Sequence, residues 1–286
     1  MILNVAAYHF TSVDNPQALA EEARARAVAA GLLGTVLVAG EGINLFLAGA
    51  GEAVRTWLDW LRAEPRFAGL VVKESYSRAQ PFQRLKVKVK PELISFRRAD
   101  ASPLQGRAPT VAPADLARWI GQGCDDKGRR LVLLDTRNRE EVGHGSFVGA
   151  LTLPIDNFTE LPAALVPHRD ELADATVVSF CTGGIRCEKA ALHLQADGMD
   201  NLLQLDGGIL GYFEQVGGFG YDGRCFVFDG RVALDPALEP LVDGDEAMAV
   251  GGPQDASHHY EHALEIVTDP RLASDVDVTG LVVRVH

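Results

Sequence analysis

The sequence predicts two units of different class, an α+β unit over residues 1–98 and an α/β unit with a parallel sheet over residues 114–235. Three observations lead to this prediction. A length of 286 residues suggests two domains. The order of strand and helix patterns changes near residue 114 from mixed to regularly alternating. Residues 99–113 (ADASPLQGRAPTVAP) are rich in Pro, Ala and Gly, which is typical of a linker.

The first unit contains two helix patterns among its strands. A strand at LNVAAYHF precedes an Ala-rich helix, which Asp14 or Asn15 is placed to cap and Gly31 to end. Two strands surround the turn in GTVLVAGEGINLFLAG, a second helix follows, and LVVKES and RLKVKVK complete the unit. The apolar residues of the second helix share one face: Val54, Trp57, Leu58 and Leu61. Up to LVVKES, this order is βαββαβ, the ferredoxin-like arrangement.

The second unit alternates between helices and strands. Helices are predicted at ADLARWIGQG, REEVGHG and EKAALHLQADG, and strands at RLVLLDTR, GALTLPI, ATVVSF and NLLQLDGG. Such alternation indicates a parallel sheet that is covered on both faces. Residues 236–286 have weak periodicity and many acids, and we interpret them as an acidic appendage without an assigned role.

The composition favours a cytoplasmic protein that does not associate with membranes. No apolar stretch reaches the roughly 18 residues that would span a bilayer, and the N-terminus lacks the basic start of a secretory signal. Four cysteines are too few for a disulfide framework in a chain of this length. They are Cys124, Cys181, Cys187 and Cys225.

The net charge of −12 hides an uneven distribution. Residues 71–98 carry eight basic residues against two acids, whereas residues 222–286 carry thirteen acids against four arginines. The alternating strand RLKVKVK places four basic residues on one face. They are Arg84, Lys86, Lys88 and Lys90. This face is either a solvated sheet surface or a contact for nucleic-acid phosphates, and the acidic background favours the second.

The stretch VVSFCTGGIRCEKAALHL places Cys181 where a buried strand ends and a helix begins near Cys187. Ligands of parallel α/β sheets bind at this edge. The helix N-terminus and Arg186 favour a thiolate, which makes Cys181 a candidate nucleophile rather than a buried structural thiol. The backbone N–H groups that can surround the sulfur belong to Thr182, Gly183, Gly184 and Ile185.

The spacing of the loop separates two kinds of chemistry. A cysteine phosphatase needs C-x5-R, whereas Arg186 gives C-x4-R, and Cys187 holds the later position. The shorter loop suits a single sulfur atom better than a phosphate. Cys187 either resolves a persulfide or sulfenate on Cys181 or packs at the start of the helix, and the sequence leaves both readings open.

Further polar residues are assigned structural roles. Asp135 could contact the cysteine loop or cap the next helix, and Arg137 and Glu141 are expected to form an i, i+4 ion pair. We predict no metal site, because no Cys/His cluster has zinc spacing. Three histidines at helical spacing are interpreted as an exposed surface: His258, His259 and His262.

Several segments resemble known families. The C-x4-R loop, LLDTRNREEVGHGSFVGALTLP and LLQLDGGILGYF resemble the active-site loop and signatures of the rhodanese domain. Together, CTGGIRCEKA, FQRLKVKVK, GTVLVAGEGIN and GRCFVFDGRVA resemble the rhodanese-domain tRNA uridine(34) hydroxylase family, over roughly residues 1–235. Gly40 departs from this resemblance, since an acid is expected there, and no cysteine follows Cys225.

The resemblance implies a ferredoxin-like domain that binds tRNA, followed by a rhodanese domain. It implies an oxidoreductase that performs oxygen-dependent 5-hydroxylation of the wobble uridine, with Cys181 forming a cysteine persulfide. The implied partner is the anticodon arm of tRNA, and the implied co-reactants are O2 and an unidentified electron donor. No cofactor is evident, because we find neither a flavin-type glycine fingerprint nor a metal triad.

No protein partner is predicted for the hydroxylase. Two alternatives remain from the residues themselves. A rhodanese-type sulfurtransferase or persulfide carrier needs Cys181 but not the basic strand. A non-catalytic module that binds tRNA or a protein needs the basic strand but not a reactive thiol.

Overall fold

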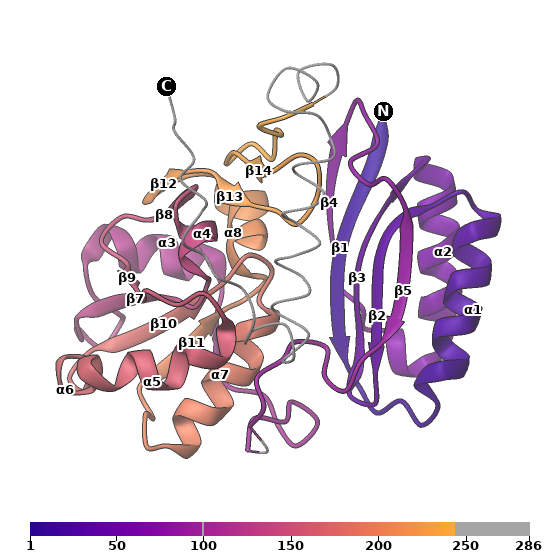
Figure 1. Cartoon of the computed structure of the whole chain (residues 1–286). Coiled ribbons are helices and arrows are strands. Elements are labelled where there is room, and N and C mark those ends of the chain that lie inside the picture. Colours follow the sequence, from indigo (N-terminus) through magenta and orange to yellow (C-terminus); the bar gives the residue numbers. More distant parts are fainter. Residues whose placement is uncertain (99, 244–286) are drawn as a thin grey trace, which may run out of the picture.

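The computed structural model describes residues 1–98 and 100–243. Two halves lie side by side, each built on a five-stranded sheet (Figure 1). We call them the N-terminal half, which contains β1 to β5, and the C-terminal half, which contains the sheet of β6, β7, β9, β10 and β11.

The N-terminal half confirms the predicted ferredoxin-like arrangement. Its sheet has the order β4-β1-β3-β2-β5, with β5 parallel to β2 and the other pairs antiparallel. The strands are β1 (Ile2–Phe10), β2 (Leu33–Ala39), β3 (Gly42–Gly49), β4 (Val72–Ser77) and β5 (Leu85–Val89). The helices are α1 (Pro16–Ala29) and α2 (Gly51–Ala63), with a 3-10 turn at Pro65–Phe67.

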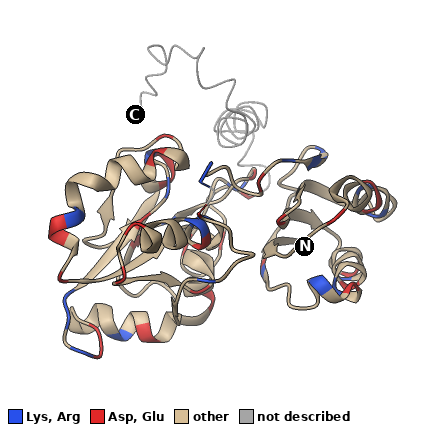
Figure 2. Ribbon diagram, turned by 90° about the horizontal axis from the view of Figure 1, so that it is seen from below, with Lys and Arg blue, Asp and Glu red and all other residues tan. Residues whose placement is uncertain are grey.

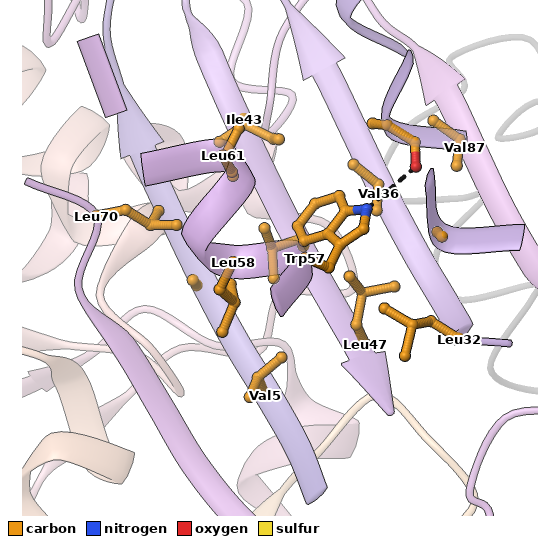
Figure 3. Packing of buried hydrophobic residues seen from close by; sticks show 14 of the residues in the cluster. Val5, Leu32, Val36, Ile43, Leu47, Trp57, Leu58, Leu61, Leu70 and Val87 are labelled. Carbon is orange, nitrogen blue, oxygen red and sulfur yellow. Dashed lines mark hydrogen bonds between the residues drawn. The ribbon is translucent and has the colours of Figure 1, made fainter. Parts of the chain in front are cut away.

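Both helices cover one face of this sheet. Trp57 of α2 lies at the centre of the core between the helices and the sheet (Figure 3). Its indole N–H donates to the carbonyl oxygen of Ala23 at 3.2 Å, so the buried ring leaves no polar atom unpaired. The predicted face of α2 is confirmed, since Val54, Leu58 and Leu61 are also buried. Asn15 caps α1 as expected, by accepting a hydrogen bond from the Ala18 N–H.

The other face of the sheet is turned toward the C-terminal half (Figure 1). Strand register aligns one row of residues across this face: Tyr8 pairs with Asn44, Asn44 with Leu37, and Leu37 with Lys88. Side chains in such a row project from the same side of the sheet. The basic residues of β5 therefore share a face with Tyr8, whereas Val87 packs into the core under the helices.

The C-terminal half confirms the predicted α/β class, because all five strands of its sheet are parallel, in the order β6-β11-β10-β7-β9. These strands are β6 (Thr110–Val111), β7 (Leu131–Asp135), β9 (Leu151–Thr152), β10 (Thr176–Phe180) and β11 (Leu202–Leu205). The helices are α3 (Pro113–Gln122), α4 (Arg139–Val142), α5 (Leu161–Leu165), α6 (Arg169–Leu172), α7 (Ile185–Ala196) and α8 (Gly208–Val216).

Helices α3 and α8 cover one face of the parallel sheet, and α5, α6 and α7 cover the other. Short antiparallel pairs and 3-10 turns complete the half. They are β8 (Gly145–Phe147) with β12 (Tyr221–Gly223), β13 (Cys225–Phe226) with β14 (Ala233–Leu234), and the turns Phe158–Glu160 and Val166–His168.

The segment expected to act as a linker is largely built into the C-terminal half. Ala101 and Ala108 belong to a core cluster of that half, and so does Phe96, whose ring stacks on Phe158 at a centroid distance of 4.5 Å. Residues 110–111 form the edge strand β6. The small residues of this Pro-rich segment suggested an exposed linker. In the structure, Ala101 and Ala108 instead pack into the core, and the segment continues into the edge strand of the sheet.

Polar contacts tie the halves together beyond the chain connection. The ammonium group of Lys189 is buried and lies 2.7 Å from carboxylate oxygens of both Glu41 and Glu92. Arg231 donates to the Ser75 hydroxyl at 2.6 Å, and the Gly230 N–H donates to the Pro81 carbonyl at 3.0 Å. The segment after β12 thus packs along the edge of the N-terminal sheet.

Charged residues of both signs are spread over both halves (Figure 2). The acidic appendage predicted from residue 236 onward lies mostly outside the described residues. Within residues 1–98 and 100–243, no helix combines the length and the apolar character needed to cross a membrane.

Candidate active site

The cysteine loop joins β10 to α7 and holds the thiol at the end of a central strand. Cys181 follows the last residue of β10 and is fully buried. The Gly184 N–H donates to the Cys181 sulfur at 3.1 Å. Gly184 has φ +103°, and a Cβ atom there would lie 2.8 Å from the Tyr8 hydroxyl. The loop therefore needs glycine at this position both for its backbone conformation and for the approach of Tyr8.

The surroundings of Cys181 favour its thiolate, as the sequence predicted. Burial alone opposes ionisation. The hydrogen bond from the Cys187 thiol, the charge of Arg186, and the N–H groups of Arg186 and Gly184 outweigh burial and lower the pKa of Cys181 to about 6. A thiolate at neutral pH is a nucleophile.

Cys187 is the protonated neighbour of this sulfur. Burial, the hydrogen bond to Cys181 and the negative charge of Cys181 raise the pKa of Cys187 well above its ordinary value. Its sulfur also lies 3.5 Å from the hydroxyl oxygen of Thr136. The two thiols therefore hold one charge, with Cys181 ionised and Cys187 protonated. Cys187 is packed in the first turn of α7 and also contacts the nucleophile, so both readings of this residue stay open.

Arg186 contributes charge to the loop, but its guanidinium is held by an acid that sequence reasoning paired elsewhere. Its two terminal nitrogens donate to the Glu141 carboxylate at 2.5 and 2.6 Å. Burial raises the pKa of Glu141, but the charge and hydrogen bonds of Arg186 dominate and the net shift is downward. Thr182 adds a hydroxyl contact to the same carboxylate at 3.4 Å. Glu141 thus fixes the direction of Arg186 at the start of α7.

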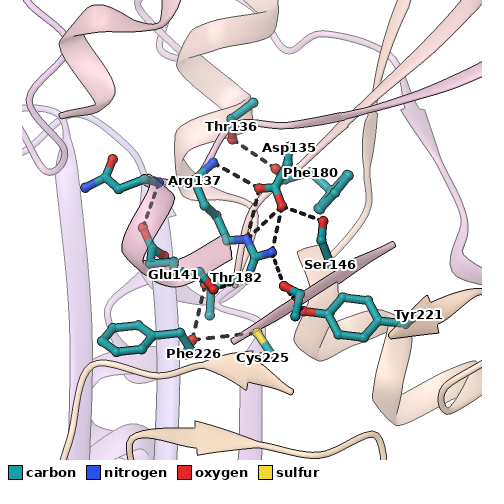
Figure 4. Close-up of polar contacts among 12 residues, drawn as sticks. Asp135, Thr136, Arg137, Glu141, Ser146, Phe180, Thr182, Tyr221, Cys225 and Phe226 are labelled. Atoms are coloured by element: carbon teal, nitrogen blue, oxygen red, sulfur yellow. Dashed lines mark hydrogen bonds and ion pairs between the residues drawn. The ribbon is translucent and has the colours of Figure 1, made fainter. Parts of the chain in front are cut away.

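The expected Arg137–Glu141 ion pair is wrong. Arg137 pairs instead with Asp135, with Nη2 to Oδ2 at 2.6 Å and both side chains fully buried (Figure 4). Ser146 donates to the same carboxylate at 2.8 Å. Asp135 therefore neither contacts the cysteine loop nor caps α4, at whose N-terminus the Asn138 N–H donates to the Glu141 carboxylate at 3.1 Å. The i, i+4 spacing misled because Arg137 precedes the helix, so its side chain does not follow helical geometry.

A cavity of about 400 Å³ lies between the two halves, and we call it the interface cavity. This size falls within the range of small-molecule sites. Its wall combines the cysteine loop with the open face of the N-terminal sheet. Among the wall residues are Cys181, Gly183, Tyr8, Asn44, Phe46 and Arg107. The loop that holds the buried thiolate therefore forms part of the wall of a space large enough for a ligand.

Sequence reasoning missed a polar cluster on this wall. The Tyr8 hydroxyl donates to Glu188 at 3.3 Å, Arg107 binds the same carboxylate, and Gln204 donates to it at 3.2 Å. Burial, followed by the charges of Glu188 and Cys181, raises the pKa of Tyr8 well above its ordinary value, so the phenol stays neutral. These residues are far apart in sequence and carry no local motif.

The basic strand lies beside the interface cavity rather than in its wall. As formed by the described residues, that wall contains none of Arg84, Lys86, Lys88 or Lys90. It does contain another basic residue of the N-terminal sheet, Lys73 on β4. The three histidines interpreted as an exposed surface, His258, His259 and His262, lie outside the described residues. Within residues 1–98 and 100–243, no three His, Cys, Asp or Glu side chains group as a metal site.

Two family models match the chain. The family described as UPF0176 acylphosphatase like domain matches residues 2–93, and the family described as Rhodanese-like domain matches residues 112–215. The second match confirms the rhodanese domain expected from the cysteine loop.

Curated relatives match across most of the chain. A protein named tRNA uridine(34) hydroxylase from Xanthomonas euvesicatoria pv. vesicatoria is 69% identical over 245 residues, which cover 86% of this chain and 99% of the relative. A protein of the same name from Xanthomonas campestris pv. campestris is 69% identical, covering 85% of this chain and 96% of the relative. One from Xylella fastidiosa is 65% identical over 243 residues, covering 85% and 95%.

Proposed function

Because the chain belongs to the tRNA uridine(34) hydroxylase family, we propose that it hydroxylates the wobble uridine of tRNA with Cys181 as the catalytic residue. The observation that carries this proposal is the thiolate of Cys181 in the wall of the interface cavity. A reactive sulfur with a ligand-sized space before it is what covalent chemistry on a base requires.

The substrate fits the site when its base leaves the RNA stack. Bases in single-stranded loops unstack at modest cost, and enzymes that modify a base take it into a pocket. The interface cavity has the volume for one nucleoside, and its wall is largely apolar, with aromatic side chains such as Tyr8, Phe46 and Phe228. Uridine 34 lies in such a loop, the anticodon loop.

We assign oxygen-dependent 5-hydroxylation to the reaction. Addition of the Cys181 sulfur to C6 of uracil forms a C–S bond, breaks the C5–C6 double bond and leaves an electron pair on C5. Molecular oxygen supplies the oxygen atom that C5 takes, and an external donor supplies the two electrons that, with two protons, reduce the second oxygen atom to water. Loss of the C5 proton and of the sulfur then restores the double bond. A cysteine persulfide on Cys181 is the form that the family resemblance implies.

The anticodon arm is the proposed partner, held by the basic face of β5. Lys86 and Lys88 project from the sheet face that also forms the cavity wall. Phosphates on either side of an extruded base would then lie over the sheet while the base enters the interface cavity. The same substrate makes the cytoplasm the proposed site of action.

The test is nucleoside mass spectrometry of tRNA from cells that lack this protein. Wild-type protein should restore 5-hydroxyuridine at the wobble position, and Cys181→Ser should not. The matched control is Cys225→Ser, because Cys225 is equally buried but burial raises its pKa to about 12. This control should restore the modification fully.

Failure of the wild-type protein would overturn the hydroxylase function. Sulfur transfer to an acceptor thiol without any change in tRNA would favour the sulfurtransferase instead. Restoration by Cys181→Ser would overturn the role of the thiol alone.

A further inference from the structure

Asn44 presents unused hydrogen-bonding groups to the interface cavity. It lies on the central strand β3, its side chain forms part of the cavity wall, and the residue is 8% exposed. Among the residues that the structure describes, none hydrogen-bonds to its carboxamide. Buried polar groups normally have a partner, so an unpaired amide that opens on a cavity calls for a ligand or water.

Asn4 also has an unpaired side-chain atom, but it differs from Asn44 because it does not lie in the cavity wall. The carbonyl oxygen of Asn4 has no partner among the described residues, but it is sealed within the protein and its N–H group donates to Ser77 at 2.9 Å. No ligand can reach it. Asn44 is different because both halves of its amide are unused and the group is accessible from the cavity.

Aromatic rings flank this amide. Tyr8 stands opposite Asn44 in the β1–β3 pair, and Phe46 follows two residues later on the same face of β3. A ring beside an amide is how single-stranded RNA bases are commonly bound, with the base stacked on the ring and its edge paired with the amide.

The side chain of Tyr8 also spans the distance from this row to the cysteine loop. Its backbone pairs with that of Asn44, while its hydroxyl reaches Glu188 and approaches Gly184. The amide and the thiolate therefore line the same space, with one tyrosine side chain between them.

We infer that Asn44 binds the N3–H edge of the substrate pyrimidine and so directs C5 and C6 toward Cys181. A carboxamide presents an acceptor and a donor side by side, which match N3–H and a neighbouring carbonyl oxygen of uracil. N3 lies across the ring from C6, so a base held at N3 turns its C5–C6 bond to the opposite wall. This inference rests on the proposed function, since it takes the ligand to be uridine 34.

The test combines a substitution in the protein with a methyl group on the RNA base, as in a double-mutant cycle. It measures binding alone, so it needs no electron donor. Anticodon stem-loops carrying either uridine or N3-methyluridine at position 34 are titrated against alkylation of Cys181, and the concentration giving half protection is measured. Methylation should raise this concentration roughly tenfold for the wild type, because the N3–H donor is lost. In Asn44→Leu, methylation should change the concentration for half protection by less than about twofold, because this variant has no carboxamide that could bind the N3–H group.

Two further variants keep the result interpretable. Thr35→Val removes a polar group from the same buried sheet face but outside the cavity wall, and should behave as wild type. Asn44→Asp keeps the acceptor, so it should still respond to N3 methylation even if Asn44→Leu is poorly folded.

The two proposals fail differently. If neither RNA protects Cys181 of the wild type, the proposed function is wrong. If both RNAs protect the wild type equally, or if methylation weakens protection of Asn44→Leu as much as that of wild type, the role of Asn44 is wrong while the function stands.

Discussion

The Glu141 carboxylate holds both terminal nitrogens of Arg186, at 2.5 and 2.6 Å, and both side chains are buried. The arginine of the cysteine loop is thus committed to a partner within the protein. Its charge still lowers the pKa of Cys181, but the two N–H groups that bind Glu141 are not available to a ligand.

Replacing Glu141 with Gln should destabilise the fold and make Cys181 more acidic. Loss of one partner of a buried ion pair costs about 3–5 kcal/mol. The uncompensated charge of Arg186 should then lower the pKa of Cys181 further. Chemical denaturation and the pH dependence of alkylation measure the two effects, and Glu140→Gln on the exposed side of α4 is the control.

The same pair sets a pH dependence for stability. Burial raises the pKa of Glu141, but Arg186 outweighs it, and the folded pKa lies below the ordinary 4.5. Its stabilising contribution is therefore complete above about pH 4.5 and is lost as the pH falls through the lowered pKa. Glu141→Gln should lack this acid-dependent loss, and an identical acid profile in both proteins would contradict the assignment.

Alkylation of Cys181 by a small reagent should follow a pKa of about 6. Cys187→Ala removes a hydrogen-bond donor to the sulfur, so it should raise that pKa and slow the reaction at pH 6. Cys225→Ala leaves the loop untouched and should change neither. Site-resolved mass spectrometry of the alkylated protein reads all four cysteines, and equal labelling of all four at pH 6 would remove the basis for a stabilised thiolate.

The protein should not hydrolyse aryl phosphates. A phosphate would have to displace the Glu141 carboxylate from Arg186, and the C-x4-R loop is one residue shorter than the phosphatase loop. Release of nitrophenol from its phosphate ester should match that of Cys181→Ser. Turnover that disappears only in this variant would show that the loop can accept phosphate.

Replacing Lys86 and Lys88 with Ala should weaken tRNA binding and flatten its salt dependence. Each lost phosphate contact reduces the slope of log K against log salt by about 0.7 to 0.9, so the double variant should lose roughly 1.4 to 1.8. Cys181 reactivity should persist, because neither lysine lines the cavity. Lys127→Ala, in a turn of the C-terminal half, is the control, and an unchanged slope in the double variant would mark the strand as a solvated face.

Local patterns were sufficient to predict much of the fold. The period of α2 predicted the buried face with Trp57, and the chemistry of asparagine predicted the cap at Asn15. The strand-to-helix turn predicted a low pKa at Cys181, because a strand end, a helix start and an arginine are adjacent in sequence. Helices α5 and α6 were not predicted, since five and four residues are too short to show a period.

Partners that meet only in three dimensions could not be predicted. Glu141 binds Arg186, which is 45 residues away in the sequence, and Tyr8 binds Glu188, which is 180 residues away. Asn44 sits in an apolar strand pattern, where a single polar residue gives no sign of the cavity beside it. Such residues depend on which sheet faces meet, and that is decided by packing rather than by local sequence.

Lys189 links the two halves of the protein close to the cysteine loop. It lies on α7, the helix that begins at the cysteine loop, and its ammonium group is clamped by Glu41 and Glu92 from the other side of the interface. A rotation that pulled the two halves apart at this point would have to separate the buried ammonium group from both carboxylates, which opposes opening of the space above Cys181. These contacts favour a fixed position of the two halves when the substrate binds. The conformational change is then expected in the RNA, whose anticodon loop must open so that the base can enter the cavity.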